Sequence, residues 1–318
     1  MTNRRPRRHG RGMTIVELLV ALVIGLFMLG ATYSMFLAYK RAYSDTEQTS
    51  RMSENGRFAL QLIASDVRMA GFLGEASVRN IDRDPDLGVV DGDCTDEGAT
   101  FDLDTYVAVV RAQDTDADGF GEAIGCIDDA LPGTDVLIIK SASPVRLAEA
   151  DLRADRVYMV TNRLRGLIFR GDDASPPTTG AGGDVPDGDY WEYRFMAYYI
   201  RAGDVPRLSR KILRGNGATQ EIVTDDLVDG IENLRVMVGI DENGDQRVDG
   251  TLAPDVVTDW TTAAHLQLFL LVRNAEEERQ PYRDEKTYRL SDDDIGPLND
   301  RFKRTVIEGS AALRNKAW

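Results

Sequence analysis

The chain has 318 residues, of which 42% are hydrophobic and 29% charged, a composition typical of a folded protein with one large domain or two small ones. Its net charge is −15, but the first twelve residues hold five arginines and no acid, so the remaining residues carry −20. An acidic body argues against nucleic acid as its direct partner and favours an exported protein that carboxylates keep soluble.

The sequence offers little for catalysis. His9 lies among the N-terminal arginines, so a zinc site or a Ser-His-Asp triad could use only His265. Residues 264–270 around His265 predict a strand, which makes it a histidine on a sheet face. There is no phosphate-binding glycine motif, and no Asp/Glu pair stands out for glycosidic acid–base chemistry. We therefore expect no enzyme, no catalytic residues and no certain cofactor, with an exported enzyme as a minor alternative.

The first expected element in chain order is a membrane-spanning helix. No residue from Leu18 to Tyr39 is charged, a run of 22 residues that can cross a bilayer. A secretory signal has a shorter apolar core with its cleavage site behind it, whereas the candidate site here, after Gly12, precedes the run. The arginines predict a cytoplasmic N-terminus and a periplasmic body.

Glu17 is an acid at the edge of this apolar run, where an unpaired charge costs about 2.5–3.5 kcal/mol. Its natural partner is a cation at the same depth, such as the new α-amino group of a processed Met13 in a neighbouring subunit. The alternative is a carboxylate that reaches the membrane interface, as happens near many helix ends.

Beyond the membrane run, the pattern predicts a continuing amphipathic helix and then many strands. The helix is expected over 14–70, with Gly71 as its C-cap. Its apolar stripe comprises Met52, Ala59, Ile63, Val67 and Ala70, widened by Phe58, Leu62 and Met69. The expected strands are 106–111, 135–140, 156–161, 190–201, 207–214, 231–240, 265–273, 286–290 and 302–313, with a helical start left open at 231–234. Loops are expected at 82–100, 113–125, 171–189 and 241–255. One long helix before many strands predicts an α+β fold, chiefly antiparallel.

The two cysteines, Cys94 and Cys126, lie in one acidic stretch. In an oxidising compartment they could close a 32-residue loop, worth about 3–4 kcal/mol on the chain-entropy model. The alternative is a pair of free thiols.

Two acidic segments have the spacing of calcium loops, which place oxygen ligands at alternate positions of a tight turn. Neither has the bidentate Glu of an EF-hand at its twelfth position. Because Asp, Asn and Gly also favour ordinary turns, an acidic surface turn is the competing interpretation. The candidate Ca²⁺ ligands are Asp114, Asp116, Asp118 and Glu122 in one loop and Asp241, Asn243, Asp245 and Asp249 in the other.

Residues 11–20 (RGMTIVELLV) resemble the class III leader of type IV prepilins and type II secretion pseudopilins. The resemblance implies that a prepilin peptidase cuts after Gly12 and methylates Met13. It also implies that Glu17 contacts the N-terminus of an adjacent subunit during assembly. Met13 stands where Phe is commoner, and Ser34 stands where many major pilins have a helix-loosening proline.

Further stretches resemble minor pilins of the PilW type: SENGRFAL at 53–60, DVRMAGF at 66–72, DGIENL at 229–234, RTV at 304–306 and LRN at 313–315. The resemblance implies a pilin-like fold in four parts: a cleaved leader (1–12), a transmembrane and assembly helix (13–40), its amphipathic continuation (41–71) and a periplasmic β-rich domain (72–318). A cysteine that often follows the Ala-Gly-Phe step is absent here, and Glu75 stands near its place.

A PilW-type chain is expected first in the inner membrane and then in the pilus, at or near its tip, where it helps to initiate assembly. The implied partners are other minor pilins, the major pilin, the assembly platform of the inner membrane and a tip adhesin. Twitching motility and cell adhesion are the implied behaviours. Two alternatives stay open: a GspJ-like minor pseudopilin of type II secretion, and a binding module that uses the loops at 82–130 and 171–189.

Overall fold

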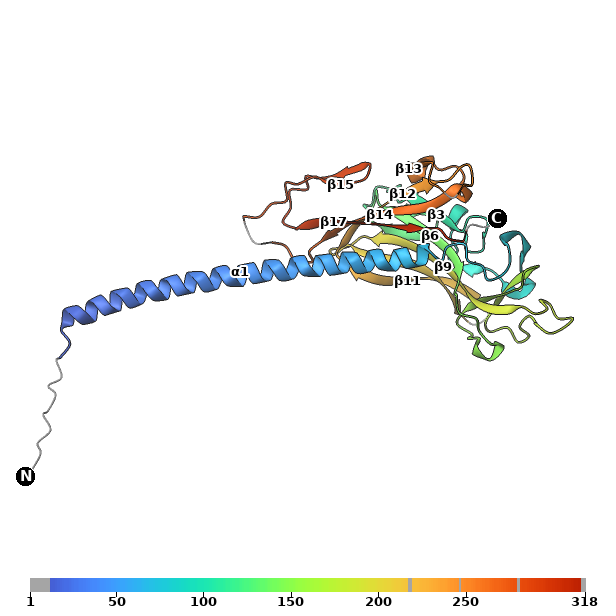
Figure 1. Cartoon of the computed structure of the whole chain (residues 1–318), viewed down its shortest axis with the longest axis horizontal. Helices are drawn as coiled ribbons and strands as arrows, with labels where there is room; N and C mark the ends of the chain where they lie inside the picture. The colour runs from blue at the N-terminus through green and yellow to red at the C-terminus, as the bar shows by residue number, and fades with distance from the viewer. Residues whose placement is uncertain (1–11, 217–218, 246, 279–280, 316–318) are drawn as a thin grey trace, which may run out of the picture. The chain divides into compact units, whose positions relative to one another are not determined.

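The computed structural model describes residues 12–216, 219–245, 247–278 and 281–315. The chain divides into two compact units, Met1–Ser50 and Arg51–Trp318. One helix, α1 (Ile15–Val67), belongs to both units, and a mostly antiparallel β-rich region follows it (Figure 1). The predicted long helix and α+β fold are therefore confirmed. Residues 1–11 of the expected leader lie outside the described residues.

In the first unit, α1 has no charged side chain from Leu18 to Tyr39, and apolar side chains lie on every side of this run. Its most apolar 18-residue window has no buried residue, and it is the one described helix long and apolar enough to cross a membrane. Thr32 Oγ1 donates to Met28 O at 2.8 Å and Ser34 Oγ to Ala31 O at 2.8 Å. These hydroxyls therefore satisfy their hydrogen bonds within the helix, as a lipid environment requires.

In the second unit, one face of α1 is buried. Its buried residues include Met52, Gly56, Ala59 and Ile63, at the three- and four-residue spacing of one helix side. The prediction that Phe58 widens this stripe is wrong, because its side chain is 57% exposed. α1 ends at Val67, and Gly71, with φ of +73°, turns the chain as the expected C-cap glycine would.

The larger sheet has eleven strands among the described residues, and its main path runs β1-β8-β7-β9-β10-β11-β2. β3 and β4 join this path through β6 and β5, which both pair with β9. Only β1–β8 and β11–β2 pair in parallel within the described sheet. The strands are β1 (Ile81–Arg83), β2 (Val90–Asp91), β3 (Val107–Arg111), β4 (Gly121–Ala123), β5 (Ile127–Ala130), β6 (Asp135–Ala142), β7 (Val157–Thr161), β8 (Gly166–Arg170), β9 (Asp189–Arg201), β10 (Arg207–Asn216) and β11 (Thr219–Asp229).

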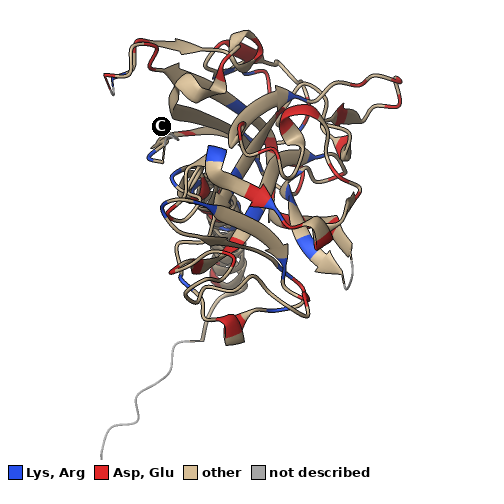
Figure 2. Cartoon of the chain, turned by 90° about the vertical axis from the view of Figure 1, so that its right-hand side faces the viewer, with Lys and Arg blue, Asp and Glu red and all other residues tan. Residues whose placement is uncertain are grey.

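A four-stranded antiparallel sheet has the order β13-β12-β14-β17, and a separate pair joins β15 to β16. These strands are β12 (Ile231–Ile240), β13 (Gly250–Leu252), β14 (Ala263–Arg273), β15 (Tyr288–Leu290), β16 (Asp293–Ile295) and β17 (Arg304–Ala312). Short 3-10 helices are η1 (Val78–Asn80), η2 (Pro85–Leu87), η3 (Asp96–Gly98), η4 (Glu149–Asp151), η5 (Pro254–Val256) and η6 (Trp260–Thr262). Acidic segments are spread over the side of the chain that Figure 2 shows.

All nine predicted strands are present, but the prediction is incomplete. It missed β1, β5, β8, β11 and β16, and the expected loops at 82–100, 113–125 and 241–255 contain β2, β4 and β13. The helical start left open at 231–234 is wrong. Gly230, with φ of +81°, reverses the chain, and Ile231 already pairs with Val272 on β14.

The main core lies between α1 and the two sheets. It combines the buried face of α1 with Met196, Tyr198 and Ile200 of β9, among others. Alternate residues of β9, such as Phe195 and Tyr199, face a second core on the opposite side of the larger sheet. Close approach of α1 requires Gly56, because a Cβ there would lie 2.7 Å from Ile307 and 2.8 Å from Val272.

Two arginines link the parts of the β-rich region. The first is Arg235, which is buried on β12: its Nη1 donates to both oxygens of Asp135 on β6, at 3.0 and 3.1 Å. Its Nε and Nη2 bind Asp292, beside the β15–β16 pair, at 2.9 and 2.7 Å. Burial raises the pKa of Asp135 to about 6, even though Arg235 and the Val236 amide favour its ionised form.

The second is Arg304, which lies at the start of β17 with its side chain 1% exposed. It pairs with Glu232, with Asp284 at 2.9 Å and with Asp300 at 2.6 Å. Arg304 therefore joins Asp284 and Asp300, in the excursion between β14 and β17, to Glu232 of β12.

Candidate functional site

The N-terminal segment forms a capped helix start. Gly12, Met13 and Thr14 precede α1, and Met13 is exposed. Thr14 donates to Glu17 Oε2 from its amide at 2.9 Å and from its hydroxyl at 3.1 Å. The Glu17 amide donates back to Thr14 Oγ1 at 3.3 Å. This reciprocal arrangement is a capping box, which satisfies amides that the first helical turn leaves without partners.

The sequence already contained the signal for this cap, since Thr14-Ile15-Val16-Glu17 has the spacing of a capping box. Neither expected role of Glu17, contact with an adjacent subunit or reach to the membrane interface, included its hydrogen bonds with Thr14. Among the described residues, no ion pair involves Glu17. Its carboxylate therefore has hydrogen-bond partners in the single chain, but no described residue supplies a cation for it.

The cysteines lie together in the β-rich region. A disulfide joins Cys94, just before η3, to Cys126, between β4 and β5. The two segments also bind through Thr95, whose amide donates to Ile124 O at 2.7 Å. The bond therefore fastens the loop at 94–103 to the β4–β5 turn.

Lys140 on β6 supports the same loop and was not predicted. Its side chain is fully buried, and Nζ donates to Glu97 O at 3.0 Å and to Asp102 O at 2.7 Å. Burial lowers the pKa of Lys140 to about 8, while the nearby Asp102 and Asp93 act in the opposite direction. No sequence pattern marks this contact, because the lysine and the carbonyls are 38 or more residues apart.

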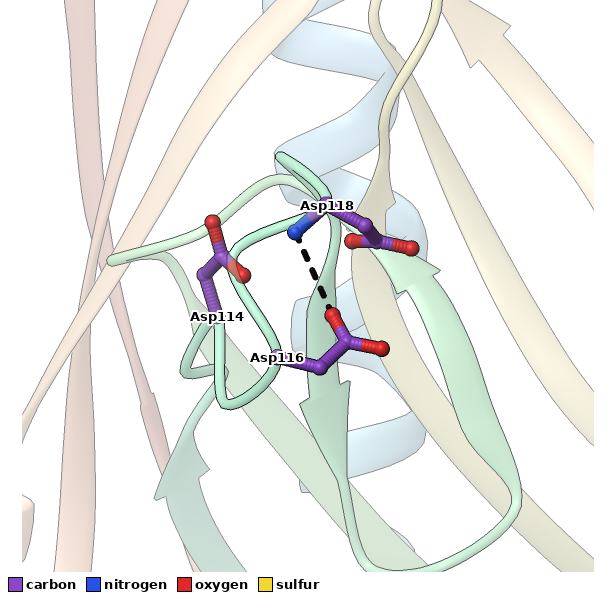
Figure 3. Close-up of side chains that lie close together, drawn as sticks. All are labelled: Asp114, Asp116 and Asp118. Atoms are coloured by element: carbon purple, nitrogen blue, oxygen red, sulfur yellow. Dashed lines mark hydrogen bonds between the residues drawn. The ribbon is translucent and has the colours of Figure 1, made fainter.

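The first candidate calcium loop, between β3 and β4, brings three of its four predicted ligands together. Carboxylate oxygens of Asp114, Asp116 and Asp118 lie within 4.8 Å of one another, and all three residues are exposed (Figure 3). Glu122 does not join them. It accepts hydrogen bonds from the Thr115 hydroxyl at 2.6 Å and amide at 2.9 Å, which lower the pKa of Glu122. The triad has suitable oxygen donors for a divalent cation, and calcium stays a prediction.

The second candidate loop uses its oxygens within the turn. Asp241 is buried and accepts from the Gly244 amide at 2.8 Å. Asp249 accepts from the Glu242 amide at 2.9 Å and from Asn243 Nδ2 at 3.1 Å. Asp245 accepts from the Arg247 amide at 2.9 Å. In the described part of this loop, which omits Gln246, no three acidic side chains converge as they do in the first loop.

His265 lies on β14, as the sequence predicted, and packs against Gly239 of β12. Burial lowers the pKa of His265, which favours a neutral ring at neutral pH. Its ring therefore belongs to the packing between the two strands.

Comparison with known families finds matches at both ends of the chain. The model of the prokaryotic N-terminal methylation motif matches residues 7–33. The model of the type IV pilus-assembly protein W matches residues 197–315, a segment that runs from β9 through the smaller sheet to Asn315. No curated protein and no solved structure matches the chain.

Proposed function

Because this chain is a PilW-type minor pilin of the type IV pilus, we propose that it is a non-catalytic subunit that helps to start pilus assembly and lies at or near the tip. The observation that carries the proposal is the N-terminal segment. It joins a methylation motif, an acid at the fifth position after Gly12 and a helix that is apolar on every side.

The localisation follows from this architecture. The chain is a single-pass protein of the inner membrane, with α1 as its anchor and the β-rich region outside, and it later belongs to the pilus. Cleavage after Gly12 would remove the five N-terminal arginines. The uncharged run of α1 from Leu18 to Tyr39 would remain as the membrane anchor. Such a helix can leave the bilayer only when neighbouring helices cover its apolar surface.

In the proposed assembly, Glu17 determines the axial position of an incoming helix. In the single chain Thr14 satisfies its hydrogen bonds, but its charge has no counter-ion among the described residues. The α-amino group of a processed Met13 in an adjacent subunit would provide that cation. The pair would form in a medium of low dielectric, where attraction between opposite charges is strong. Glu17 would thus favour one axial position of the incoming helix over others.

The match to the pilus-assembly protein W favours a pilus over the GspJ-like alternative of type II secretion. The proposed partners are therefore other minor pilins, the major pilin, the prepilin peptidase and the assembly platform of the inner membrane. A tip adhesin is the proposed neighbour at the free end. The loops at 82–130 and 171–189 would carry the role of a binding module, because they lie outside the matched segment.

The proposal is tested by the intact mass and N-terminal sequence of the protein from native membranes and from sheared pili. We expect a chain that starts at methylated Met13, with processing blocked in Gly12→Val. In Glu17→Leu, processing should continue while recovery in pili falls. A wild-type chain that retains residues 1–12 would contradict the proposal, and its recovery only in a secretion pseudopilus would favour the alternative.

A further inference from the structure

The turn between β7 and β8, residues 162–165, presents an exposed leucine. Leu164 is 80% exposed, and Arg163 and Arg165 on either side of it are exposed too. A single exposed apolar residue is ordinary on a soluble protein and needs no explanation. The features that distinguish this turn are its rigidity, its charge and its place in the fold.

Asn162 holds the turn in one conformation. Its Oδ1 accepts from the amides of Leu164 at 2.8 Å and Arg165 at 2.9 Å, while its own amide donates to Arg165 O at 3.0 Å. Its Nδ2 donates to Pro186 O at 2.7 Å, which fastens the turn to the neighbouring loop at 171–189. A side chain presented on such a turn loses little conformational freedom when a partner binds it.

Neither arginine forms an ion pair with a described residue, although the chain is strongly acidic. Residues 13–318 carry −20, yet within the described residues no carboxylate lies within 4.0 Å of either guanidinium. Hydrogen bonds from Thr178, and to a lesser extent the charge of Arg165, lower the pKa of Asp184, but that carboxylate is bound to Thr178. By contrast, Arg146 pairs with Glu75 at 2.9 Å and with Asp189 at 3.0 Å.

The turn lies at the end of the β-rich unit beyond the C-terminus of α1. Gly74, seven residues after α1 ends, is in close contact with Thr161 at the end of β7, since a Cβ on Gly74 would lie 2.2 Å from Thr161 Oγ1. This contact places the β7–β8 turn next to the residues that follow the end of α1.

From these observations we propose that the β7–β8 turn is a contact surface for an acidic protein that adjoins this end of the β-rich unit. Leu164 fills an apolar depression of that partner, and Arg163 and Arg165 bind carboxylates around it. Arginine suits this role because its planar fork binds a carboxylate through two hydrogen bonds. The inference rests on the proposed function, since it takes the neighbour to be another component of the assembly.

The test places a photo-crosslinking phenylalanine derivative at position 164 of the full chain in its native cells. Val256 provides a control site outside the proposed binding loops, because it is 54% exposed and its nearest charged neighbours in sequence are acids, Asp255 and Asp259. We expect a protein adduct from position 164 whose crosslinked peptide is rich in Asp and Glu, and no comparable adduct from position 256. Arg163→Glu with Arg165→Glu should reduce the adduct at least about tenfold, whereas the corresponding Lys pair should keep most of it.

Three results would overturn the inference: a lipid adduct alone, equal adducts from positions 164 and 256, or an adduct that charge reversal leaves unchanged. Absence of any adduct, in a chain that is processed and recovered in pili, would also overturn it while leaving the proposed function intact. A chain that is never processed or never reaches pili would instead contradict the proposed function.

Discussion

Replacement of Arg304 by methionine tests whether one buried cation organises the excursion between β14 and β17. The change removes a guanidinium whose side chain is 1% exposed and keeps an unbranched side chain of similar length. It leaves Asp284, which is fully buried, and Glu232, which is 15% exposed, without their main cation. Among the described residues, Asp284 would keep only the Tyr288 hydroxyl, at 3.0 Å, and a longer contact with the Lys286 amide at 3.4 Å.

Loss of one partner of a buried pair typically destabilises a protein by about 3–5 kcal/mol, because the other charge stays buried without compensation. Asp300 adds little to this figure, since its side chain is 35% exposed and water screens it. We therefore expect Arg304→Met to lower the free energy of unfolding by about 3–5 kcal/mol. The matched control is Arg289→Met. Arg289 is 75% exposed and pairs with Asp294 at 3.5 Å, so its loss should be at most about 0.5 kcal/mol.

The assay is urea unfolding of the processed full chain in detergent, together with hydrogen exchange of the peptides that cover 281–303. Arg304→Met should also lose amide protection in this segment, and a second change, Asp284→Asn, should restore part of the stability by removing the uncompensated charge. The reasoning fails if Arg304→Met and Arg289→Met differ by less than about 1 kcal/mol and the segment keeps its protection.

Three further predictions follow from the fold and the loops. Burial raises the pKa of Asp135 to about 6 in the folded chain, from an ordinary 3.8. Protonation of this carboxyl therefore stabilises the folded chain. The stabilisation is fully present below pH 3.8 and disappears as the pH rises through 6. Urea unfolding at pH 5 and 7.5 should show wild type gaining about 1 kcal/mol at pH 5 relative to Asp135→Asn, and equal pH dependence would contradict the shift. Gly56→Val should destabilise the chain by about 3 kcal/mol or more, because its Cβ would overlap Ile307 and Val272, and a melting temperature within a degree of wild type would show that α1 can shift instead. Millimolar EDTA should lower the melting temperature of the wild-type chain if Asp114, Asp116 and Asp118 bind calcium. The double variant Asp116→Asn with Asp118→Asn should show no such effect. An unchanged melting temperature in wild type would contradict calcium binding.

The features that the sequence predicted correctly are those that local spacing encodes. The uncharged run from Leu18 to Tyr39 is sufficient to predict an apolar helix, because length and composition alone decide membrane crossing. The strand around His265 follows from a short apolar run, and Gly71 from its place after the last periodic residue. The methylation motif is also contiguous, so Gly12, Met13 and Glu17 could be proposed together from ten residues.

β11 shows why other features could not be predicted. Its residues 219–229 include Asp225 and Asp226, which favour a loop when considered alone. In the sheet, Asp225 pairs with Arg210 at 2.9 Å, and Asp226 with Arg201 and Arg207 at 3.2 Å. Neighbouring strands thus supply the charges that make this strand favourable.

The sequence by itself thus determined the anchor, the processing motif, nine of the seventeen described strands and the α+β class, because each is encoded by contiguous residues or by the order of the elements along the chain. Only the tertiary structure decided that Phe58 faces outward, that Lys140 holds the disulfide loop and that Arg304 gathers Glu232, Asp284 and Asp300. It also decided that Asn315 Nδ2 donates to Arg68 O, at 3.1 Å, beyond the end of α1. These contacts join residues tens to hundreds of positions apart, and periodicity along a chain carries no information about which distant groups burial will bring together.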